Sequence, residues 1–299
     1  MKKASILFAL VGVAVAPPVL AGPSLVINYN TSAFENLILQ NGDISVTVSY
    51  TPRTPGQVTE NNLRYELFYQ GQSQQSIEAS AYNHAEFRIQ DLDNDDIPEV
   101  VVQDFSGGAH CCTNHVVYRW QPESEQFSSL ETGYRDGLGG NFRDLDGDGY
   151  SEFMTVDNAF LYRFSSYAGS YPPQQIFTYG GGTLTETTRS FPDLLQSGVD
   201  DMREAFDRLR QREDRYGNGI LAGYVAQSSL LGPEAYETAW QFMLENYDRE
   251  DDWGLGIRDE GGDIVDQHSD FPTALRAFLI ETGYLDEVGQ PVGEVEELL

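Results

Sequence analysis

The distribution of apolar residues divides the chain into two parts. Up to about residue 190, apolar positions come in short runs rich in Val, Thr, Tyr and Phe, and the run at 44–50 alternates like a half-buried strand. Comparable runs predict further strands at 63–69, 85–89, 99–103, 115–120, 153–156, 160–164, 175–179 and 183–188. Gly180–Gly182 predicts a tight hairpin turn. Because long helical periodicity is absent, this part is predicted to be all-β.

After residue 190 the apolar positions follow the helical period. Val199, Met202, Phe206 and Leu209 recur three or four residues apart, with charged residues between them. Further predicted helices are 217–231, 233–247 with Pro233 in the first turn, and a last helix from a Ser269 or Asp270 cap to Gly283, with an acidic loop at 248–262. The chain is therefore predicted to be α+β, with a β domain at 22–190 and an α-helical C-terminal region at 191–299.

The first 21 residues have the three parts of a secretory signal peptide. Lys2 and Lys3 precede an apolar run at 4–16, and Val19–Ala21 provides a small-residue cleavage site. The run is too short to span a bilayer, and no later segment approaches that length. We therefore expect an exported protein, periplasmic or extracellular, without a membrane span.

The charge limits the partners that the chain can have. Its formal net charge is −29, which argues against nucleic acid and anionic membranes, since both attract basic patches. The same charge is compatible with cation binding. At 40% hydrophobic and 12% aromatic residues, the chain can bury a substantial core.

Two acidic turns have the same spacing, one beginning at Asp91 and the other at Asp144. Each has carboxylates at turn positions 1, 3, 5 and 9 and then runs into an apolar strand. Crowded like charges oppose ionisation, and Ca²⁺, which takes about six to eight oxygen ligands, removes that cost. An EF-hand would need a glutamate at position 12, where this chain has Val102 and Thr155. The sequence predicts a calcium loop used twice, with a backbone carbonyl at position 7.

These turns resemble the calcium loops of FG-GAP or VCBS repeats, the blades of integrin-α-like propellers, over about residues 85–165. The resemblance implies propeller-blade-like strands in the β domain and two Ca²⁺ ions. The ligands that it implies are Asp91, Asp93, Asp95, Ile97 and Glu99 in the first turn and Asp144, Asp146, Asp148, Tyr150 and Glu152 in the second.

A second motif, Gly107-Gly108-Ala109-His110-Cys111-Cys112-Thr113, is similar to a group of secreted bacterial VCBS-repeat proteins. That group joins its β region to a helical C-terminal part whose last helix resembles 278–284 here. The resemblance implies no established activity.

Cys111 and Cys112 are the chain's two cysteines. In an oxidising compartment adjacent free thiols are not expected to persist, so a vicinal disulfide is the first interpretation. Two buried thiols are the second interpretation. A soft-metal site that also uses His110 and His115 is the third, and it would require a tight loop.

No catalytic residue is identified. Either cysteine could pair with a histidine such as His84, His110 or His115, but the sequence shows no group that would orient the base. The first functional hypothesis is therefore a secreted calcium-binding repeat protein that recognises a protein or polysaccharide partner. The alternative is a secreted hydrolase of surface polymers in which calcium is structural.

Overall fold

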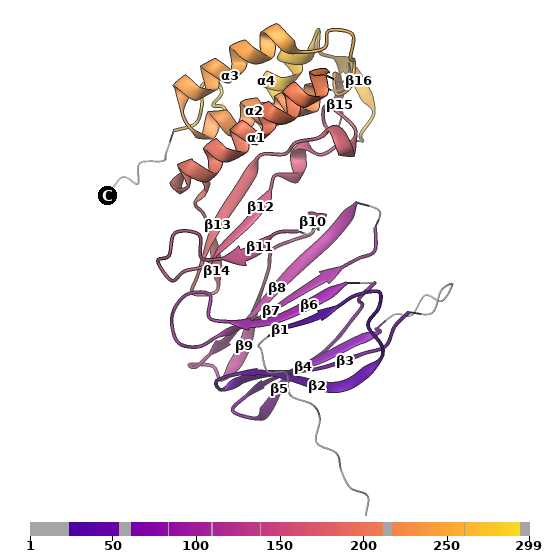
Figure 1. Ribbon diagram of the computed structural model, residues 1–299, viewed down its shortest axis with the longest axis vertical. Helices are drawn as coiled ribbons and strands as arrows, with labels where there is room; N and C mark the ends of the chain where they lie inside the picture. The colour runs from indigo at the N-terminus through magenta and orange to yellow at the C-terminus, as the bar shows by residue number, and fades with distance from the viewer. Residues whose placement is uncertain are drawn as a thin grey trace, which may run out of the picture. The chain divides into compact units, whose positions relative to one another are not determined.

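The computed structural model describes residues 24–53, 61–82, 84–108, 110–137, 139–211, 217–259 and 261–293. The predicted signal peptide lies outside these residues. Antiparallel sheets dominate the N-terminal part and helices the C-terminal part, which confirms the α+β class (Figure 1). Within the described residues the chain forms two compact units, one of residues 24–91, 95–107 and 116–129, the other of 92–94, 108–115 and 130–293.

Two larger sheets account for the first strands. One is the meander β2-β3-β4-β5, made of β2 (Phe34–Asn41), β3 (Ile44–Tyr50), β4 (Leu63–Tyr69) and β5 (Gln72–Ala79). The other has the order β1-β6-β7-β8-β10, with β9 also paired to β8. Its strands are β1 (Ser24–Ile27), β6 (Ala85–Gln90), β7 (Glu99–Phe105), β8 (Cys111–Gln121), β9 (Gln126–Glu131) and β10 (Arg135–Asp136).

The core of the first unit is built from the apolar faces of both sheets. Along β3 the residues alternate between buried and half-buried, as the sequence pattern predicts. Tyr65 of β4 packs edge-on against Phe87 of β6 and shares a 2.8 Å hydrogen bond with the hydroxyl of Tyr118 of β8. Buried aromatic rings with satisfied hydroxyl groups hold the two sheets together.

The sequence pattern does not predict strand β5, and the position of this strand in its sheet explains why. Its sequence, QSQQSIEA, is polar, and it is an edge strand of its sheet, exposed over most of its length. An edge strand pairs on one side only and needs no continuous apolar face. Periodicity therefore misses it, although its hydrogen bonds to β4 run from Leu63 to Tyr69.

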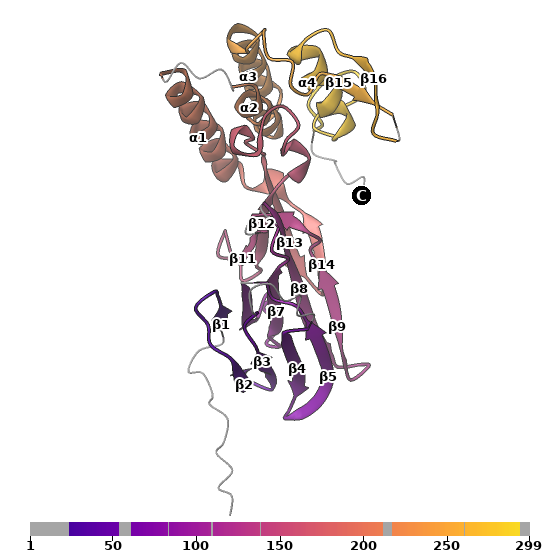
Figure 2. The ribbon, with the colours of Figure 1, turned by 90° about the vertical axis from the view of Figure 1, so that its right-hand side faces the viewer.

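The second unit contains a four-stranded sheet, a hairpin and the helices. The sheet β11-β12-β13-β14 consists of β11 (Asn141–Arg143), β12 (Glu152–Val156), β13 (Gln174–Gly180) and β14 (Thr183–Glu186). The helices are α1 (Pro192–Gln211), α2 (Asn218–Leu230), α3 (Pro233–Asn246) and α4 (Phe271–Glu281), and β15 (Gly256–Arg258) pairs with β16 (Ile264–Gln267) (Figure 2). The predicted boundary at residue 190 stays a prediction; this sheet and the helices belong to one unit.

The strand predicted at 160–164 is wrong. Residues 158–160 form a short 3₁₀ helix, and Phe160 and Phe164 join the helical core instead. Both rings pack edge-on against Phe278 of α4, at 4.9 and 5.4 Å between centroids. Two aromatic residues in a short run are compatible with a strand, but here the helices provide the larger apolar surface.

The helix boundaries follow the signals in the sequence. Pro233 opens α3, and Asp270 caps α4 by accepting a 2.9 Å hydrogen bond from the backbone N–H of Thr273. The predicted loop at 248–262 instead contains β15 within its last part. No helix among the described residues combines the length and apolarity needed to cross a membrane.

Helix α2 is buried on every side. Its Gln227 is fully buried, accepting a 2.9 Å hydrogen bond from the N–H of Gln174 and donating one of 2.9 Å to the carbonyl of Leu195. At Gly223 an added Cβ would collide with the carbonyl oxygen of Tyr171. The helix therefore depends on small residues at its contacts.

We predict that Gly223→Ala destabilises the protein by roughly 1–3 kcal/mol, measured as a lower urea midpoint of unfolding. Alanine normally favours a helix by about 1 kcal/mol over glycine, so a loss would show that steric contact dominates. Gly180→Ala is the matched control, because nothing lies within 4 Å of its added Cβ. A stabilised Gly223→Ala variant would contradict the close packing.

Candidate metal centre

The two acidic turns occupy equivalent places in two antiparallel strand pairs. The first joins β6 to β7, with Gln90 opposite Glu99, and the second joins β11 to β12, with Arg143 opposite Glu152. In both pairs the residue before the turn therefore faces the glutamate at position 9. The sequence repeat is a repeat of structure.

The backbone of the two turns also matches. Positions 4 and 6 have positive φ in both copies, at 57° and 66° for Asn94 and Asp96 and at 82° and 95° for Gly147 and Gly149. This region of φ favours glycine, and asparagine and aspartate tolerate it better than other residues. The different residues of the two copies thus meet the same backbone requirement.

Backbone N–H groups point at the first aspartate of each turn. Asp91 accepts a 3.0 Å hydrogen bond from the N–H of Asp96, and Asp144 accepts one of 3.1 Å from the N–H of Gly149. At position 5, Asp95 and Asp148 each accept a 2.8 Å hydrogen bond from the N–H two residues later. These bonds fix the turn and orient its carboxylates.

Three carboxylates meet in each turn, from positions 1, 3 and 9. One oxygen each from Asp91, Asp93 and Glu99 lie within 4.8 Å of one another, and the same holds for Asp144, Asp146 and Glu152. Ligands of one Ca²⁺ ion, each about 2.3–2.6 Å from the metal, are separated by comparable distances. The carboxylates at position 5 are not part of either cluster, and the carbonyls of Ile97 and Tyr150 stay predicted ligands.

The glutamates at position 9 are buried. Glu99 is 0% exposed and Glu152 is 1% exposed. A buried carboxylate loses its hydration and needs compensation from charge or hydrogen bonds. Burial raises the pKa of Glu152; the Leu145 N–H opposes this by lowering it, while the Asp146 charge adds to it.

An arginine that the sequence pattern does not reveal gives the first turn a cationic partner, which makes the electrostatic surroundings of the two turns different. Arg119 of β8 lies 2.7 Å from an Asp95 oxygen and 3.6 Å from a Glu99 oxygen. No described basic side chain forms an ion pair with the carboxylates of the second turn. Arg119 lies on β8, the second strand after the first turn, so the spacing within the motif could not reveal it.

The tip of the first turn contacts the second turn. The N–H of Ser151 donates a 2.7 Å hydrogen bond to the carbonyl of Leu92, and a Cβ added at Gly149 would lie 3.1 Å from the amide of Asn94. The Asp93 carboxylate accepts a 2.8 Å hydrogen bond from the N–H of Gly181, in the predicted hairpin turn between β13 and β14. Residues 92–94 of the first turn therefore pack with the second turn inside the second unit.

The cysteine pair opens β8. The structure joins Cys111 to Cys112, and Asp136 of β10 lies opposite Cys111. A Cβ on Gly108 would collide with the Cys111 carbonyl, so the approach to the pair needs glycine. That the two thiols are oxidised to a disulfide in the exported protein stays a prediction.

The two histidines beside the cysteines lie in different surroundings. His110 stacks on the ring of Tyr167 with centroids 4.2 Å apart, while His115 is buried edge-on against Phe153 at 5.2 Å. Among the described residues, the groups of metal-ligating side chains that converge are the two acidic turns. The geometry therefore gives the soft-metal interpretation no support.

Comparison with known proteins identifies the family. The sll0997 C-terminal domain family matches residues 195–283. A Synechocystis protein named "Probable thylakoid lumen protein sll0997" is 32% identical over 258 residues, which cover 83% of this chain and 75% of that protein. A Sinorhizobium fredii protein, "Uncharacterized protein y4bJ", is 33% identical over 222 residues, 67% of this chain and 32% of that protein. No solved structure matches.

The chain belongs to the family of sll0997. The resemblance to FG-GAP or VCBS repeat proteins is therefore wrong, and so is the function of a calcium-binding repeat module for recognition that followed from it. The described sheets do not show a propeller either. A short acidic turn between two strands can occur on unrelated folds, so it does not identify a family.

We predict that Arg119→Gln lowers the free energy of unfolding by roughly 1–3 kcal/mol, measured in chelator. The reason is that the Glu99 carboxylate stays buried after it loses the positive charge of the Arg119 guanidinium. Adding Glu99→Gln to that variant should restore part of the loss. The control Arg208→Gln removes an exposed helix pair and should cost about 0.5 kcal/mol or less. If urea unfolding showed equal effects of the two arginine variants, Arg119 would not be the residue that compensates the buried Glu99 carboxylate.

We also predict that Cys111 and Cys112 are bonded in protein exported to an oxidising compartment, since no other cysteine is present to pair with either. Intact-mass analysis after alkylation should show no added label without reductant and two labels with it. The Cys111→Ser variant, which leaves one thiol, should take one label in both conditions. Two labels on the unreduced protein would refute the bond.

Proposed function

We propose that this chain is an exported protein whose two acidic turns each hold a divalent cation, with Ca²⁺ as the first candidate. The cations would stabilise the turns and the strands that flank them. The observation that supports this is the same convergence of carboxylates at positions 1, 3 and 9 in both turns, with a buried glutamate in each.

Ca²⁺ suits these turns better than the softer metals do. The ligand atoms are carboxylate oxygens, which favour Ca²⁺, Mg²⁺ or Mn²⁺ over metals that prefer thiolate or imidazole. Three carboxylates leave further coordination positions for backbone carbonyls or water, and Ca²⁺ accepts such irregular sets more readily than Mg²⁺. Comparison with relatives adds no support for calcium, so the proposal rests on the turns themselves.

Export is proposed from two independent observations. The N-terminal residues have the pattern of a signal peptide. A relative whose match covers 83% of this chain is named "Probable thylakoid lumen protein sll0997". A periplasmic or extracellular location would follow.

We predict that Ca²⁺ raises the unfolding temperature of chelator-treated protein. Linkage gives about 2.7 kcal/mol per site when free cation is about 100 times Kd. Asp146→Asn and Asp93→Asn each keep a hydrogen-bond acceptor but lose a charge, so each should remove part of the shift and the double variant nearly all of it. Titration calorimetry should count two ions in the parent and one in each single variant.

The matched control is Asp201→Asn, which removes an exposed charge from α1. It should keep the full shift, because a general effect of charge neutralisation would not depend on the turns. Mg²⁺ at equal concentration should give a smaller shift. Unchanged melting curves with both cations would refute the proposal, and a shift equally reduced by all three variants would show screening instead of binding.

A further inference from the structure

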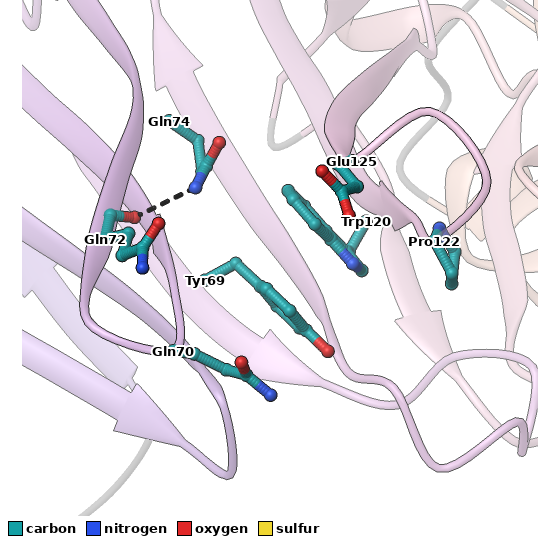
Figure 3. Close-up of a pocket in the computed structure, with 7 residues that line it drawn as sticks. All are labelled: Tyr69, Gln70, Gln72, Gln74, Trp120, Pro122 and Glu125. Carbon is teal, nitrogen blue, oxygen red and sulfur yellow. Dashed lines mark hydrogen bonds between the residues drawn. The ribbon is translucent and has the colours of Figure 1, made fainter.

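The first unit contains a pocket whose lining residues belong to neither acidic turn. Its volume is about 430 Å³, and it is lined by Tyr69, Gln70, Gln72, Gln74, Trp120, Pro122 and Glu125. These residues come from the β4–β5 hairpin, the end of β8 and the turn that follows it. In Figure 3 the glutamines lie on one side of the two aromatic rings, and Pro122 and Glu125 lie on the other.

Two aromatic rings form a rigid surface within this pocket. Tyr69 and Trp120 are stacked with centroids 4.1 Å apart and ring planes 9° from parallel. Trp120 is 3% exposed and is held from another direction by Phe127, at 5.3 Å and 70°. The half-buried Tyr69 is therefore backed by a ring that cannot move away, which lowers the entropy cost of binding against it.

The hairpin beside the rings has a β-bulge at Gln74, which lines the pocket. The register of β5 on β4 shifts between Leu67 and Phe68, and Gln74 faces no residue across that bulge. Bulges redirect side chains and are frequent beside binding sites. Gln70 is also held in place, because its amide donates a 3.0 Å hydrogen bond to Asp43.

The lining selects for a neutral ligand with many hydroxyl groups. Each glutamine amide both donates and accepts, as hydroxyl groups require, and the Glu125 carboxylate can accept from two neighbouring hydroxyls. None of the lining residues is basic, and the chain carries a formal charge of −29, so an anionic ligand is disfavoured. The negative face of an aromatic ring attracts the C–H groups on one side of a sugar ring.

We propose that this pocket binds a sugar ring of a neutral saccharide, stacked on Tyr69 and hydrogen-bonded by the glutamines and Glu125. The site is independent of the proposed cation sites, because it shares no residue with them. The pocket is open and polar, so it fits one or two sugar units at the surface of a longer chain more closely than a buried metabolite.

The test is binding of two neutral oligosaccharides, maltohexaose and cellohexaose, to the purified protein by saturation-transfer NMR and titration. At least one should bind saturably at millimolar concentration or below. Tyr69→Ala should weaken binding about tenfold, while Tyr69→Phe, which keeps the ring, should bind like the parent. Gln74→Ala and Glu125→Gln should each weaken it roughly two- to tenfold.

The control Gln40→Ala removes an exposed glutamine of the same unit that does not line the pocket, and it should leave binding unchanged. If Tyr69→Ala fails to fold, the exposed Gln74 and Glu125 variants decide the question. Choline is the competing probe, because a carboxylate beside aromatic rings can also attract a cation. Binding of choline without either saccharide, binding of neither saccharide, or an equal effect of Gln40→Ala overturns the proposal.

Discussion

Burial of a carboxylate at the start of a strand is the constraint on which both acidic turns depend. Glu99 and Glu152 begin β7 and β12 and have almost no exposed surface. Charge in such a place must be compensated where it stands. Arg119 provides part of it for Glu99, and the backbone N–H of Leu145 provides part of it for Glu152. The left-handed positions 4 and 6 of each turn direct further backbone N–H groups at Asp91 and Asp144. The residues of the turn therefore have to compensate negative charge as well as adopt positive φ at positions 4 and 6.

The same motif has two electrostatic settings. In the first turn a fixed guanidinium, Arg119, stands beside Asp95 and Glu99 and offsets part of the negative charge. In the second turn the described compensation consists of hydrogen bonds, such as the 2.9 Å bond from the N–H of Leu145 to Glu152. A permanent cation competes with a bound one for the same oxygens. We therefore expect the second turn to attract a metal ion more strongly than the first.

The sequence predicted what depends on local pattern and missed what depends on partners. Strands with a buried face, such as β3, and helices with caps, such as α4, were found close to their true bounds. The polar edge strand β5 was missed, and the apolar run at 160–164 was assigned to a sheet although its rings belong to the helical core. The acidic turns were located correctly as loops between strands. Arg119 and the aromatic pocket were not found, because distant segments create both.

The mistaken family assignment follows from the same distinction. An acidic turn needs only the nine residues of each copy, 91–99 or 144–152, and two paired strands, so it reports local geometry and not the architecture around it. The match at 195–283 instead covers the helices and the β15–β16 hairpin, including the helix α2, which is buried all round. The carboxylates, the cysteine pair and the aromatic pocket all precede it in the sequence, so the proposed sites lie outside the matched domain.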